Sequence, residues 1–70
     1  MSVKKEHKKI GFNVLMQRRS RGWTQDELSR VAGVSRARIS DIEHGKESFT
    51  LTTVMKIANA FGMSYLELLR

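Results

Sequence analysis

Residues 24–45 of the chain read TQDELSRVAGVSRARISDIEHG. Thr24 is a good helix N-cap, and Glu27 three residues later completes a capping box. Gly33 supplies the left-handed residue that a tight turn needs, and Ser35 caps the segment that follows it. The stretch therefore predicts two short helices, each with its own start signal, joined by a tight turn.

This layout is that of a helix-turn-helix motif, whose second helix lies in the major groove of DNA. The chain is basic, with 13 Lys and Arg against 7 Asp and Glu, a formal charge of +6. The charge alone also fits an ordinary solvated surface, but together with the motif it predicts a polyanion partner. Most of these cations precede residue 40, at Lys4, Lys5, Lys8, Lys9, Arg18, Arg19, Arg21, Arg30, Arg36 and Arg38.

The 70 residues include neither cysteine nor proline. Without cysteine there is no disulfide and no thiolate metal ligand, so the core depends on aliphatic packing or on a partner subunit. No apolar run approaches the ~20 residues of a membrane span, and residues 1–9 lack the apolar segment of a secretory signal. We expect one small cytoplasmic domain that does not associate with a membrane.

Three further helices are expected around the motif. Residues 1–7 are charged without an apolar period and predict a flexible basic arm, and residues 8–70 form the domain. The first helix is expected over residues 8–20. A fourth begins after Thr50, with Phe49 preceding it as a staple residue, and a capping box of Ser64 and Glu67 opens a short fifth helix. The predicted fold is all-α with five helices and no strands.

The motif and its flanks resemble the Cro and phage-repressor type of helix-turn-helix domain, also called XRE-like. The resemblance covers about residues 10–69. It implies a compact five-helix, lambda-repressor-like fold, in which helices two and three bind the DNA. It also implies a transcription regulator or repressor that binds a two-fold operator as a homodimer. It rests on Arg18, Gly22, Trp23, Thr24, Gln25, Glu27, Leu28, Gly33, Val34, Ser35, Ile39, Ser40, Ile42, Glu43 and Gly45.

The resemblance also implies individual roles. Gln25 matches a position that contacts the phosphate backbone or nearby bases, and Arg18 and Glu43 match a buried pair that ties helix one to helix three. The recognition helix, about residues 35–44, lies in the major groove. Its groove-facing positions match Ser35, Arg36, Ala37, Ser40 and Asp41.

A helical wheel supports a base-reading face on this helix, opposite Ile39 and Ile42. Arg36 matches the two acceptors of guanine, and Ala37 is small enough to contact a thymine methyl. Ser40 donates or accepts a hydrogen bond. Asp41 has two interpretations, because it either accepts from cytosine N4 or pairs with Arg38 three residues before it.

Four residues are expected at the DNA backbone instead. Arg38 lies on the flank of the recognition helix, which suits a phosphate. Ser35 is first a helix cap and also lies near that flank. The amide groups at the start of the second helix, around Thr24 and Gln25, favour a phosphate as well.

Helix one departs from the family pattern. Gln17 stands where the family usually has an apolar residue, and Phe12, Leu15 and Met16 are additional apolar side chains. The favoured explanation is packing against helix five through Tyr65 and Leu69, and the alternative is an apolar patch for a partner. The low charge after residue 50 further predicts a homodimer through helices four and five.

Other functional classes fit less well. An enzyme is not expected, because the two histidines lie apart and no phosphate loop or acid–base pair is present. Neither a cofactor nor a metal site is expected. The alternative function is an antitoxin that neutralises a toxin and regulates its own operon, since Thr50-Leu51-Thr52-Thr53 slightly resembles antitoxins of kinase-type toxins. A toxin protein and RNA polymerase are the protein partners considered beside duplex DNA.

Overall fold

The computed structural model describes residues 3–46 and 50–70, with the side chains of residues 3–5 left out. The described residues form helices and no strand, so the all-α prediction is confirmed. None of these helices is long and apolar enough to cross a membrane. The helices are α1 (Val3–Ser20), α2 (Gln25–Ala32), α3 (Arg36–Glu43), α4 (Leu51–Ala60) and α5 (Tyr65–Leu68).

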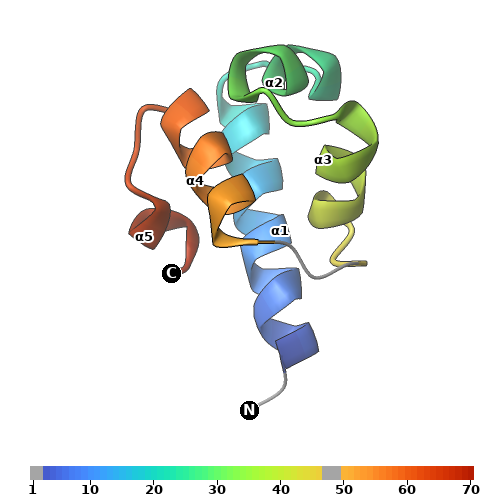
Figure 1. Ribbon diagram of the computed structural model, residues 1–70, viewed down its shortest axis with the longest axis vertical. Coiled ribbons are helices and arrows are strands. Elements are labelled where there is room, and N and C mark those ends of the chain that lie inside the picture. The colour runs from blue at the N-terminus through green and yellow to red at the C-terminus, as the bar shows by residue number, and fades with distance from the viewer. Residues whose placement is uncertain (1–2, 47–49) are drawn as a thin grey trace.

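The long helix α1 runs along the molecule, and α3 and α5 pack directly against it (Figure 1). Helix α2 lies across the C-terminal end of α1 and contacts both α3 and α4. Helices α3 and α5 lie on opposite sides of α1 in this view. The α1–α3 contact is close, because a Cβ atom built on Gly11 would overlap the carbonyl oxygen of Ile42. The second half of the motif is thus fixed to the central helix.

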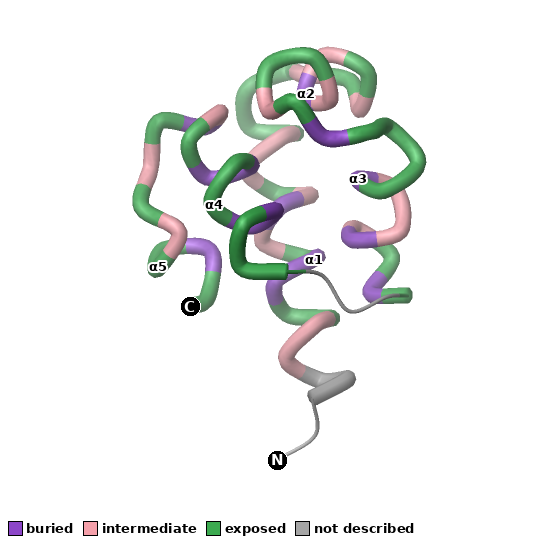
Figure 2. The backbone as a smooth tube through the Cα atoms, in the orientation of Figure 1, coloured by how far each residue is buried: buried purple, intermediate pink, exposed green. Residues whose placement is uncertain are grey.

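One apolar cluster holds the five helices together. Figure 2 shows the buried positions on the inward sides of the helices, with exposed positions outside. Trp23, in the α1–α2 loop, stacks on Phe61 with ring centroids 5.8 Å apart. The Arg21 guanidinium also lies over the Phe61 ring. The largest fully buried side chains are Val14, Leu28, Ile39, Ile42, Ile57 and Leu68.

The helix starts follow local capping chemistry. The Glu27 amide donates to Thr24 Oγ1 at 3.1 Å, and the Thr24 amide donates to Glu27 Oε1 at 3.0 Å, so the expected capping box is formed. The second expected box is wrong: Ser64 Oγ accepts from the Leu66 amide at 3.2 Å rather than from Glu67. Helix α5 is only four residues long, and its serine closes a local turn instead.

The first helix begins earlier than expected, at Val3 instead of near residue 8. No glycine or proline interrupts residues 3–10, and Glu6 in the first turn favours the positive end of the helix dipole. The segment expected as an arm is therefore helical from Val3 onward. Residues 1–2 lie outside the described residues, as does Phe49, the expected staple residue before α4.

The expected packing of the extra apolar residues of α1 is also wrong for two of them. Phe12 and Met16 remain 57% and 48% exposed, whereas Leu15 is partly buried. The contact from α1 to α5 is made by Asn13, whose Nδ2 donates to the Leu68 carbonyl at 2.7 Å. Since Asn13 faces α5, the side chains of Phe12 and Met16 point along the outer face of α1.

Candidate nucleic-acid interface

The turn between α2 and α3 sets the angle of the motif. Gly33 caps α2 in the left-handed conformation, with φ of 70°, and its amide donates to the Ser29 carbonyl at 2.9 Å. The Ser29 hydroxyl donates to the Val34 carbonyl at 2.6 Å. Ser35 then starts α3, because its Oγ accepts from the Arg38 amide at 3.2 Å. These local bonds fix where α3 begins.

The start of α3 presents a polar face to solvent. Ile39 and Ile42 are buried on the opposite face, while Arg36 and Ala37 are exposed. The four residues expected to contact bases line one shallow depression of about 240 Å³, together with Gln25 of α2. Its lining residues are Gln25, Arg36, Ala37, Ser40 and Asp41.

The residues expected at the DNA backbone divide between two places. Ser35 and Arg38 line a second depression, of about 260 Å³, on the side of α3 that faces α4. Lys56 of α4 lines it too, a cation that the sequence did not single out. Thr24 is exposed at the start of α2, where its Oγ1 is engaged in the capping box.

Arg18 and Glu43 form a pair that joins α1 to α3. Arg18 Nε donates to Glu43 Oε2 at 2.7 Å, and Nη2 donates to Oε1 at 3.0 Å. The side chains are 12% and 3% exposed, respectively. This hydrogen bonding raises the pKa of Arg18 above its ordinary value, mainly through the carboxylate it contacts.

The carboxylate of Glu43 also contacts α2. Gln25 Nε2 donates to Glu43 Oε1 at 3.0 Å, while Arg18 Nη1 donates to the Trp23 carbonyl at 2.8 Å. The start of α2 is thereby tied to the end of α3. This role of Gln25 was not expected from the sequence, because it depends on how the two helices face each other.

A second ion pair was also missed. Arg36 Nε lies 3.3 Å from Asp26 Oδ1, with the two side chains 67% and 73% exposed. Asp41 and Arg38 are both among the described side chains, and they form no ion pair with each other. The interpretation of Asp41 as the partner of Arg38 is therefore not supported, and the contact with cytosine N4 stays a prediction.

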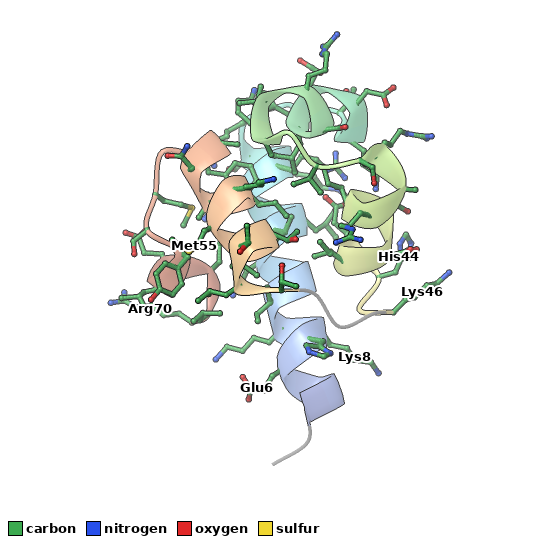
Figure 3. All side chains as sticks on the ribbon, in the orientation of Figure 1. Glu6, Lys8, His44, Lys46, Met55 and Arg70 are labelled. Atoms are coloured by element: carbon green, nitrogen blue, oxygen red, sulfur yellow. The ribbon has the colours of Figure 1, made fainter. Side chains whose placement is uncertain are left out.

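Cationic residues occur on both sides of the molecule. Figure 3 places His44 and Lys46 on the α3 side of the molecule, with Met55 and Arg70 on the α4–α5 side. Among the described residues no group of three or more His, Asp or Glu is arranged to hold a metal ion.

The helix-turn-helix unit is also found in known proteins. The helix-turn-helix family model HTH_3 matches residues 14–68, which include the whole α2–turn–α3 unit. The chain belongs to the helix-turn-helix family. Its relatives include an uncharacterized HTH-type transcriptional regulator, y4dJ, of Sinorhizobium fredii, which is 36% identical over 61 residues. That match covers 87% of this helix-turn-helix chain and 79% of the relative.

A second relative is the antitoxin HipB of Escherichia coli K12, 40% identical over 47 residues. The match covers 67% of this chain and 53% of HipB.

Solved structures of the same family share the fold. An HTH_3 family transcriptional regulator from Vibrio cholerae superposes with a TM-score of 0.91 at 30% identity, covering 96% of this chain and 38% of that chain. The restriction-modification controller protein C.AhdI from Aeromonas hydrophila superposes with a TM-score of 0.87 at 25% identity, covering 91% and 97%. The five-helix arrangement is therefore that of helix-turn-helix transcription regulators.

Proposed function

We propose that this chain is a cytoplasmic, sequence-specific regulator of transcription that binds duplex DNA as a homodimer on a two-fold operator. The observation that carries the proposal is the exposed polar face of α3, anchored by the buried Ile39 and Ile42 on its other face. A helix held in this way inserts into the major groove without rearrangement of the core.

The face carries groups that match base edges. Arg36 donates to O6 and N7 of guanine, Ser40 donates or accepts, and Ala37 contacts a thymine methyl. Asp41 accepts from cytosine N4. All four line one depression, so they meet a short stretch of adjacent base pairs.

The flanks of this face bind the phosphates. Arg38 and Ser35 lie beside Lys56 of α4, where a phosphate on one side of the groove is met by two cations. On the other side, the Gln25 amide in the first turn of α2, next to the exposed Thr24 cap, binds a phosphate through the helix N-terminus. The Thr24 amide is already engaged by Glu27.

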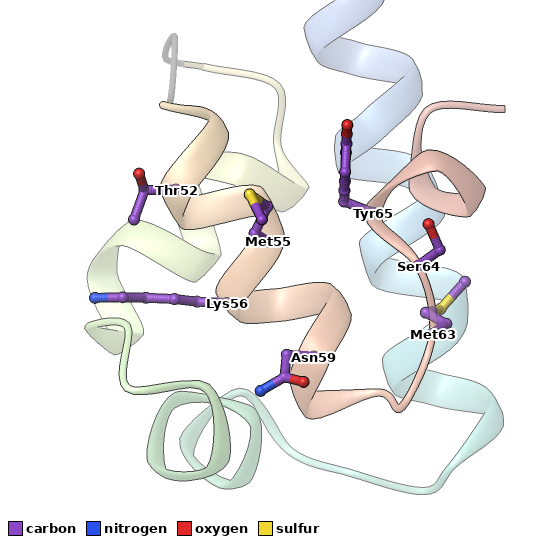
Figure 4. Close-up of a pocket in the computed structure, with 7 residues that line it drawn as sticks. All are labelled: Thr52, Met55, Lys56, Asn59, Met63, Ser64 and Tyr65. Carbon is purple, nitrogen blue, oxygen red and sulfur yellow. The ribbon is translucent and has the colours of Figure 1, made fainter.

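Dimerisation is assigned to α4 and α5. The exposed apolar side chains here are Leu51 and Met55 of α4, Leu66 of α5 and Leu69 directly after α5. Figure 4 shows the groove between the two helices, about 560 Å³, with Met55 on one side and Met63 and Tyr65 on the other. A second copy seated there leaves the base-contacting face of α3 uncovered, because α3 and α5 lie on opposite sides of α1 in Figure 1. Lys56 lies at the boundary, since it lines both this groove and the depression beside Arg38.

The relationship to HipB supports a second candidate function, an antitoxin that also regulates its own operon. Phe12 and Met16 give a toxin partner an exposed apolar surface on α1, outside both the DNA face and the dimer groove. DNA binding is common to both functions. A toxin partner would be shown by a complex that protects α1 while α3 still binds DNA.

Selection of sites from random duplex DNA tests the main proposal. The expected result is one enriched sequence with two-fold symmetry and half-sites about 34 Å apart, one turn of the duplex. Enrichment of no sequence, with equal binding to all duplexes, would overturn it.

A further inference from the structure

The ion pair between Asp26 and Arg36 joins the beginnings of the two helices of the motif. Asp26 is the second residue of α2 and Arg36 is the first residue of α3. The contact uses Nε of the guanidinium, 3.3 Å from Asp26 Oδ1. In the described part of the chain, the terminal Nη1 and Nη2 groups of Arg36 make no hydrogen bond.

The neighbours of Asp26 hold it in place. Gln25 before it is bonded to Glu43 at the end of α3, with Nε2 and Oε1 3.0 Å apart. Glu27 after it is bonded to Thr24 in the capping box. The backbone of Asp26 is therefore fixed relative to α3, and its carboxylate stays within reach of Arg36.

An ion pair this exposed contributes little to folding in water. At a DNA surface its effect is different. A guanidinium whose Nε is held by a carboxylate directs its two Nη groups outward, and two N–H groups in one plane match O6 and N7 of guanine. A carboxylate in the same position repels the phosphates of any DNA sequence.

We infer that Asp26 is a positioning residue that orients Arg36 toward guanine and lowers the affinity for DNA that lacks guanine at that position. The inference rests on the proposed DNA-binding function. The repulsion from phosphate acts on every duplex, whereas the gain through Arg36 requires the correct base. Asp26 therefore increases the difference in affinity between the operator and other sequences.

The test compares the parent with Asp26→Asn, which removes the charge and keeps the shape of the side chain. Binding is measured on the selected operator, on the operator with its Arg36-contacted guanine replaced, and on a scrambled duplex. We expect Asp26→Asn to bind scrambled DNA more tightly and to lose about two- to fivefold of its discrimination at the guanine, the range that one exposed ion pair provides.

Two controls separate positioning from general charge and from stability. Glu6→Gln makes the same charge change in the first turn of α1, outside the DNA face and the dimer groove, and should leave discrimination at the guanine unchanged. In an Arg36→Ala background, Asp26→Asn should not reduce discrimination further. A role of Asp26 confined to stabilising the start of α2 would lower the melting temperature without changing base preference.

Two results would overturn this inference. One is unchanged discrimination at the guanine in Asp26→Asn, and the other is an equal loss of that discrimination when Asp26→Asn is made in the Arg36→Ala background. If the parent still selects an operator, these results leave the proposed function standing. If the parent selects no operator, the inference falls together with the proposed function.

Discussion

Glu43, the last residue of α3, receives two hydrogen bonds from the Arg18 guanidinium of α1, at 2.7 and 3.0 Å. Its side chain is 3% exposed. The same carboxylate accepts from Gln25 at the start of α2. One buried acceptor therefore fixes three helices, including both helices of the motif.

Removing that acceptor should be costly. Glu43→Ala leaves the Arg18 charge with only the Trp23 carbonyl and leaves Gln25 without its acceptor, at an expected cost of about 3–5 kcal/mol in free energy of unfolding. Arg18→Met should lower the free energy of unfolding by less, because methionine fills the volume of the arginine side chain and Glu43 keeps its hydrogen bond from the Gln25 side-chain amide. Glu43→Gln should also lower the melting temperature. Denaturation that is unchanged in Glu43→Gln would show that the pair does not hold α1 to α3.

Gly11 should not tolerate a methyl group. In Gly11→Ala the new Cβ overlaps the Ile42 carbonyl oxygen, a backbone atom that cannot rotate away. The expected overpacking cost is about 1–3 kcal/mol and exceeds the roughly 1 kcal/mol that alanine gains over glycine in a helix. Thermal melts should show a clear loss for Gly11→Ala and little change for Met16→Ala on the exposed face. An equal or higher melting temperature for Gly11→Ala would contradict the close α1–α3 packing.

The capping box predicts a pH dependence of stability. Hydrogen bonds from Thr24 lower the pKa of Glu27, so the folded state favours the ionised form. This contribution is present above the ordinary glutamate pKa and is lost as the pH falls through the lowered pKa. Glu27→Gln keeps the hydrogen bonds of the box and removes the titration.

Denaturation of both proteins from about pH 6 to about pH 3 should therefore show the stability advantage of the parent over Glu27→Gln shrinking on acidification. Glu67→Gln serves as the control carboxylate away from α2. An advantage that does not change with pH would mean that the carboxylate is not engaged by Thr24.

If the dimer forms through the α4–α5 groove, a charge placed in that groove should disrupt it. Met55→Lys places an ammonium opposite Tyr65 and should convert the dimer to a monomer in sedimentation. Phe12→Lys changes a similarly exposed apolar residue on α1 and should leave the dimer intact. The reverse pattern would move the interface to α1, and a monomeric parent at tens of micromolar would contradict dimerisation itself.

The parts of the fold that the sequence predicts are those encoded locally. The Thr24–Glu27 box, the left-handed Gly33 and the Ser35 cap each depend on residues within four positions, and all are formed. The early start of α1 was missed because the Lys-rich segment has no apolar period that would mark it as helical.

Relations between helices were harder to predict. Phe12 and Met16 face solvent because Asn13 makes the contact to α5, a rotation of α1 that periodicity alone does not determine. Asp26 meets Arg36 only because the turn at Gly33 brings the two helix starts together. The sequence predicts which residues of α3 contact bases, whereas the ion pair that Arg36 forms with Asp26 is seen only in the structure.

The central claim is that α3 reads bases through Arg36 while Arg38 holds a phosphate. Affinity for operator and scrambled duplexes across several salt concentrations tests it most directly. Arg36→Ala should cost about 1–3 kcal/mol per half-site on the operator alone and relax the preference at one base pair.

In the same measurement, Arg38→Ala should weaken both duplexes alike and reduce the salt slope by about one per subunit, because one counterion fewer is released. If Arg36→Ala instead weakens operator and scrambled DNA equally, Arg36 is a phosphate contact and the assignment of the reading face is wrong.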